Sequence, residues 1–210
     1  MKNENQRIYN KDIILKQARP QPLDFNHFQS KRDFLRYLTL ARNSFAKGKF
    51  DLASDYCRQI TANGVSPNID DIILEAYYLW CLANLNLRRS DDVKRICYEA
   101  RTKFGNYLDL VYFELTASAI SCDFEKVMKF SETFLEILEE PGSMTEPKKS
   151  RTAEKYADVL IMYARALADT GQTELALKYY EQYLNDFEDN GEVRNSIDEI
   201  KKCQGMQKTI

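Results

Sequence analysis

The chain has 210 residues, of which 44% are hydrophobic and 30% are charged, as in an ordinary globular protein. Its net charge of −2 lacks the basic excess of most nucleic-acid binders. No apolar stretch approaches the roughly 20 residues that a membrane-spanning helix needs. The polar N-terminus is unlike a signal peptide, so we expect a cytoplasmic protein with no nucleic-acid partner and no membrane span.

Residues that carry chemistry are few and scattered. The cysteines are odd in number, and no two of them form a C-x-x-C pair, so we expect reduced thiols that serve as small packing residues. The single histidine, His27, cannot build a multi-histidine metal site or a histidine-dependent triad alone. No glycine-rich phosphate loop occurs. The sequence therefore predicts no catalytic site, no metal and no cofactor. The cysteines are Cys57, Cys81, Cys97, Cys122 and Cys203.

Residues 1–30 are expected to form an extended arm. Two prolines within residues 18–28 interrupt any continuous helix, although a short helix fits residues 11–17. The same stretch carries three large apolar side chains, which would gain free energy by covering apolar surface. We therefore expect the arm to pack against the helices that follow, either as a cap or inside a groove. The alternative is a loose tail.

Four segments of 24 residues follow, and they align without gaps. Each segment reads as two amphipathic helices with a short break between them, and a small or β-branched residue recurs at one place in the second helix. Two helices approach closely at such a place. Successive copies of this residue lie 40, 34 and 49 positions apart, so the base period is about 34. The recurring residues are Ala53, Val93, Val127 and Ala176, and the breaks begin at Gly48, Arg88, Cys122 and Gly171.

The longest insertion, over residues 139–154, carries proline, glycine and charges of both signs, and it is expected to be an exposed loop. A cluster of basic residues in and directly after this insertion is either solvated or a contact for an anion or a partner. They are Lys148, Lys149, Arg151 and Lys155. Residues 192–203 are expected to form a final helix that caps the last repeat.

This pattern resembles the tetratricopeptide repeat family. The resemblance covers repeats at about 34–67, 74–106, 108–141 and 152–187, with a cap and tail over 191–210. It implies an all-α, right-handed superhelix of four helix pairs plus a capping helix. The matching first-helix positions are Tyr37, Leu40 and Ala41; Tyr77, Trp80 and Cys81; Val111, Glu114 and Leu115; and Leu160, Tyr163 and Ala164. Repeat three departs from the family at Glu114, where an apolar residue is expected, and at Leu115, where a small one is expected.

In this family the first helices line a concave wall, so the resemblance implies a scaffold or adaptor that binds a protein or peptide there without catalysis. The expected groove is mixed aromatic and polar. Only Arg42 suits the terminal carboxylate that chaperone-binding members hold, so that mode is not expected. The groove residues are Leu38, Arg42, Phe45, Tyr78, Leu82, Asn86, Asp109, Tyr112, Thr116, Ile161, Arg165 and Asp169.

An alternative comes from residues 104–138 and the insertion after them. They look like the helical module that follows the catalytic domain in some bacterial family 2 glycosyltransferases. That likeness implies an accessory module of a glycosyltransferase system, since no β-rich transferase segment is present. A small enzyme and a peptide-sensing regulator are weaker rivals. Self-association into a homo-oligomer is left open.

Overall fold

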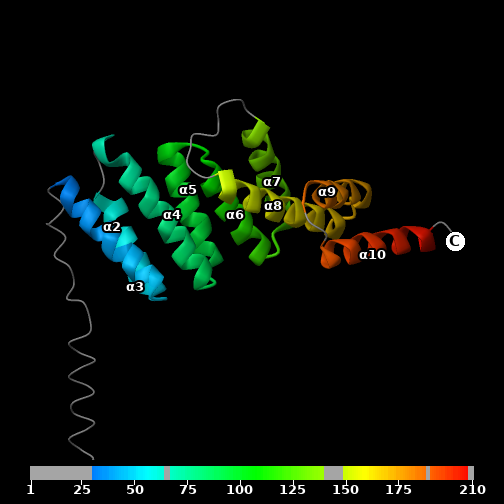
Figure 1. Cartoon of the computed structure of the whole chain (residues 1–210), viewed down its shortest axis with the longest axis horizontal. Coiled ribbons are helices and arrows are strands. Elements are labelled where there is room, and N and C mark those ends of the chain that lie inside the picture. The colour runs from blue at the N-terminus through cyan, green and yellow to red at the C-terminus, as the bar shows by residue number, and fades with distance from the viewer. Residues whose placement is uncertain (1–29, 64–66, 140–148, 188–189, 208–210) are drawn as a thin grey trace, which may run out of the picture.

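The computed structural model describes residues 30–63, 67–139, 149–187 and 190–207 (Figure 1). Across these ranges every regular element is a helix and no strand occurs, which confirms the predicted all-α class there. The helices form an elongated stack from α2 at one end to α10 at the other (Figure 1). The expected arm lies outside the described residues except for Ser30.

The described chain forms four consecutive helical hairpins and a final helix. A short 3-10 turn at Pro67–Ile69 leads into the second hairpin. The hairpins are α2 (Lys31–Ala46) with α3 (Phe50–Asn63), α4 (Asp70–Asn86) with α5 (Ser90–Phe104), α6 (Leu108–Ile120) with α7 (Phe124–Glu139), and α8 (Lys149–Asp169) with α9 (Thr173–Asp186); α10 spans Gly191–Gln207. Within the part of the chain that is described, no helix combines the length and apolar composition needed to cross a membrane.

The four hairpin turns share one backbone conformation. Each contains one residue with a left-handed backbone, at φ values of 70°, 59°, 54° and 83° for Gly48, Arg88, Cys122 and Gly171. In each turn the next residue's N–H donates to the carbonyl five positions earlier, at 2.8–3.0 Å, as in a Schellman motif. The breaks therefore lie where the sequence pattern places them, even where the turn residue is not glycine.

Neighbouring helices pack in chain order, and the first helices α2, α4, α6 and α8 also contact one another in sequence. The recurring small residues of the second helices are all buried, with at most 1% of their surface exposed. Trp80 lies in the core, where its indole N–H donates to Ser54 Oγ at 2.8 Å. At the end of the stack, Val193 and Ile197 of α10 pack against Tyr180 of α9.

The unusual residues of repeat three are accommodated by their neighbours. Leu115 is fully buried in an apolar cluster with Val111 and Phe134. The Glu114 carboxylate accepts a hydrogen bond from Arg101 Nη1 at 2.5 Å, so its charge is paired where the side chain is mostly buried. A charged residue at this apolar position is tolerated because an arginine from the preceding hairpin neutralises it.

The structure corrects the expected loop over residues 139–154 and the packing role of two cysteines. Helix α8 begins at Lys149, so the end of the expected loop over residues 139–154 is helical; residues 140–148 lie outside the described part of the chain. The packing interpretation fits the buried Cys57, Cys81 and Cys97, but two other cysteines are exposed. One of these, Cys122, supplies the left-handed turn residue, and a residue in such a tight external turn does not reach the core.

Candidate partner-binding face of the first helices

Side chains from α2, α4, α6 and α8 interact in sequence along the stack. Arg42 of α2 pairs with Glu75 of α4, its Nε lying 2.8 Å from Glu75 Oε1. Lys155 of α8 lies over the rings of Tyr78 from α4 and Tyr112 from α6. These residues, together with Asp109 and Asp158, define a surface that we call the first-helix face. Its continuity follows from the packing of each first helix against the next.

The centre of the first-helix face is an ammonium group held between two aromatic rings. Lys155 Nζ lies 5.6 Å from the ring centroid of Tyr78 and 5.5 Å from that of Tyr112, within the range of cation–π attraction. The same ammonium pairs with the Asp109 carboxylate. Only 12% of the Lys155 side chain is exposed. The lysine therefore ties α4, α6 and α8 together instead of extending into solvent.

Burial perturbs the protonation of this cluster. It lowers the pKa of Lys155 to about 8, because desolvation disfavours the charged ammonium. The Asp109 carboxylate acts in the opposite direction, since it favours the charged form. The pKa of Tyr112 is raised by burial and by the hydrogen bond that its hydroxyl donates to Asp158 Oδ2 at 2.7 Å. Tyr112 thus stays neutral and acts as a donor.

Two further contacts orient the aromatic rings. Tyr78 meets the buried ring of Phe113 edge-on, with the ring centroids 5.0 Å apart. Tyr112 packs near Phe134, at a centroid distance of 6.4 Å. Both tyrosines are half-buried, so part of each ring stays accessible. The two rings are therefore held in place by contacts within the chain.

Most of the expected groove residues are at least partly exposed to solvent. Half-buried positions are Phe45, Tyr78, Leu82, Asp109, Tyr112, Thr116 and Ile161, and exposed positions are Arg42, Asn86, Arg165 and Asp169. The expectation for Leu38 is wrong: it is 1% exposed and belongs to the core, because α2 packs against both α3 and α4. Asn86 and Thr116 donate to carbonyls of their own helices, at 2.9 Å and 2.8 Å, so the Thr116 hydroxyl proton and one of the two Asn86 amide protons are already used.

Sequence reasoning missed Glu75, Lys155 and Asp158 on this face. Lys155 belongs to the basic cluster around the insertion and lies one residue beyond the expected end of the insertion at residue 154. A signal was present, because the apolar residues Tyr156, Val159 and Leu160 follow Lys155 at helical spacing. The expected fourth repeat, at about 152–187, includes Lys155, and this periodicity places Lys155 on its first helix, α8.

The face offers aromatic surface and charges of both signs, which suits non-covalent recognition. No group of three or more histidine, cysteine or acidic side chains in the described ranges is placed to hold a metal ion. No protein-family model, curated protein or solved structure matches the chain. The functional assignment therefore rests on the residues themselves.

Proposed function

We propose that the chain is a tetratricopeptide-type scaffold, without a catalytic site of its own, that holds a segment of a partner protein on the first-helix face. Four hairpins with equivalent turns and an equivalent buried small residue support a superhelix of repeated helix pairs. Such a superhelix presents a long surface built from successive first helices, to which one extended or helical segment can bind.

The observation that carries this proposal is the pair of half-buried tyrosines around Lys155. Aromatic residues that are partly desolvated and held near the middle of a surface are the usual anchors of protein interfaces. Tyr78 and Tyr112 are oriented by Phe113 and Asp158, so little side-chain entropy is lost when a partner covers them. Preorganised, partly exposed rings of this kind support a role in binding a partner more than a role in stabilising the fold alone.

The charges around the tyrosines indicate what kind of segment fits. The Arg42–Glu75 pair has side chains that are 55% and 43% exposed, and such a surface pair contributes little to stability. Either member can therefore exchange its partner at small cost. A segment with an apolar or aromatic side chain for the tyrosines and a charged residue near Arg42 or Glu75 matches the first-helix face.

The test begins with affinity capture by the tagged full chain in its native cell, followed by mass spectrometry and purification of the partner. Truncating Tyr78 and Tyr112 together to alanine is expected to weaken binding by about 2 kcal/mol or more in a titration. Tyr98→Ala is the matched control, because Tyr98 is 72% exposed on the second helix α5. Circular dichroism checks that the variants are folded.

Unchanged affinity of a folded double variant would contradict the proposal. If the tyrosine truncations disturb folding, Arg42→Glu serves as a second variant, because Arg42 is exposed and lies outside the apolar core. Co-purification of a glycosyltransferase would favour the accessory-module alternative, which otherwise stays a prediction.

A further inference from the structure

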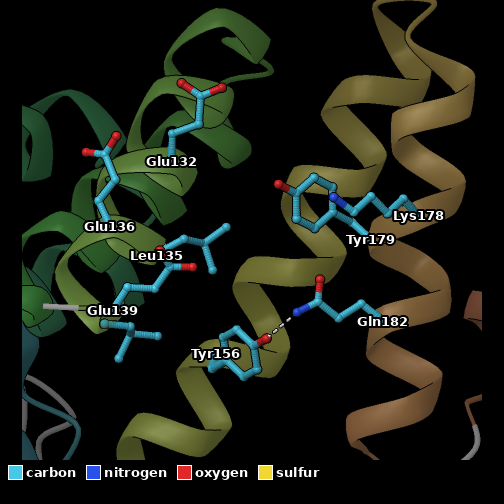
Figure 2. A pocket seen from close by; sticks show the side chains of 9 residues that line it. Glu132, Leu135, Glu136, Glu139, Tyr156, Lys178, Tyr179 and Gln182 are labelled. Atoms are coloured by element: carbon cyan, nitrogen blue, oxygen red, sulfur yellow. Dashed lines mark hydrogen bonds between the residues drawn. The ribbon is translucent and has the colours of Figure 1, made fainter.

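A groove of about 450 Å³ lies between α7 and α9, with Tyr156 of α8 at one end (Figure 2). Both bordering helices are the second helices of their hairpins, and each packs against α8. None of the lining residues belongs to the first-helix face. The groove is therefore a separate feature, and its volume falls in the range of about 300–1,000 Å³ that is typical of ligand sites.

The apolar part of the groove consists of half-buried side chains that are already fixed in place. They are Leu135, Leu138, Tyr156 and Tyr179. The Tyr179 ring centroid lies 4.6 Å from that of the buried Tyr163. The Tyr156 hydroxyl accepts a hydrogen bond from Gln182 Nε2 at 2.7 Å, which joins α8 to α9 (Figure 2). An apolar ligand would meet a preformed surface here.

The α7 wall of the groove is acidic. Glu132, Glu136 and Glu139 follow one another at intervals of four and three residues, so they lie on one side of the helix (Figure 2). Glu132 accepts a hydrogen bond from the Tyr163 hydroxyl at 2.8 Å. Glu136 and Glu139 make no ion pair with any described residue. The one lining cation, Lys178, lies over the Tyr179 ring. The groove is thus lined by three carboxylates and one ammonium.

We propose that this groove docks a basic amphipathic helix of a partner protein. Leucine-like side chains of that helix would cover the apolar residues, and its lysines or arginines would pair with the glutamates. A helix is favoured because the three glutamates span about 10 Å along α7, or two turns, and a partner helix presents cations at the same interval. The bordering helices α7 and α9 form its two sides, with α8 between them.

The test uses the full chain and two synthetic helical peptides of equal length, one built from leucine and lysine and the other from leucine and glutamate. We expect the leucine–lysine peptide to bind in a fluorescence anisotropy titration and the leucine–glutamate peptide not to bind. The triple variant Glu132→Gln, Glu136→Gln, Glu139→Gln should weaken binding by about tenfold, as expected for the loss of three exposed ion pairs.

A second triple variant with the same change in charge serves as the control for non-specific attraction of the basic peptide to an acidic protein. Glu125→Gln, Glu174→Gln and Glu199→Gln remove exposed carboxylates that do not line the groove. Equal weakening by the two triple variants, or no binding of the leucine–lysine peptide, would overturn the proposal. A photo-crosslinking peptide gives an independent readout: crosslinks on α7 and α9 support it, and crosslinks confined to other helices overturn it.

Discussion

Replacing Gly171 with alanine is expected to lower the free energy of unfolding by about 1 kcal/mol. Gly171 has φ = 83°, and a Cβ atom built there meets no other atom within 4 Å. The cost is therefore one of backbone conformation and not of steric overlap. A left-handed backbone costs an L-residue roughly 1–2 kcal/mol. The smaller conformational freedom of alanine in the unfolded chain offsets about 0.4–1 kcal/mol of this.

Arg88 occupies the equivalent turn position with φ = 59°, and replacing it with glycine should have the opposite effect on the free energy of unfolding. Arg88 is exposed, and its side chain makes no hydrogen bond or ion pair within the described residues. Arg88→Gly should therefore relieve the left-handed backbone without losing a contact. We expect it to raise the free energy of unfolding by about 0.5–1 kcal/mol.

Urea unfolding followed by far-UV circular dichroism measures both effects through the transition midpoint and slope. Gly191→Ala is the matched control, because Gly191 has no positive φ and a Cβ atom there also meets nothing within 4 Å. It should leave stability unchanged or raise it by up to about 1 kcal/mol. The explanation is wrong if Gly171→Ala changes the free energy of unfolding no more than Gly191→Ala does. It is also wrong if Arg88→Gly lowers the free energy of unfolding.

Other parts of the molecule give further predictions. Ala53→Phe and Ala176→Phe should each cost about 1–3 kcal/mol or more, because both alanines are fully buried between helices; an unchanged melting temperature would show that the repeat register is wrong. The folded-state pKa of Lys155 is about 8 and its ordinary value is 10.5. The unfolded chain thus binds more protons between these values, and the free energy of unfolding should rise with pH there. The Lys155→Met variant should lack this rise, which is measured as the difference in the free energy of unfolding between the wild type and the variant at each pH. A difference that falls between these two pH values would contradict the lowered pKa of Lys155.

The repeat register could be predicted from the sequence because local chemistry marks two of the turns and the alignment of the four segments supplies the other two. Gly48 and Gly171 mark the ends of first helices directly, since glycine adopts a left-handed backbone without strain. Arg88 and Cys122 carry no such signal, and only the alignment of the four segments identified them as turn residues. Small residues such as Ala53 and Ala176 recur because each second helix has one close approach to a neighbour.

Helix periodicity also identified the apolar side of each helix, but not which neighbour covers it. Leu38 illustrates this: its place in the repeat suggested an open groove, whereas contact of α2 with α4 buries it. Glu114 looked like an exception to the pattern until the structure placed Arg101 beside it. The partner of a charge in another hairpin depends on how the hairpins stack, which a single sequence does not display.

The sequence by itself determined the helical class of the described residues, the positions of the turns and the buried small residues, because each follows from helical periodicity and from the alignment of the four segments with one another. Only the tertiary structure decided that Lys155 sits between Tyr78 and Tyr112. It also decided that glutamates of α7 line one groove together with residues of α8 and α9. Both arrangements bring together residues of different hairpins that lie more than 30 positions apart, and their geometry is set by the angles at which whole helices pack.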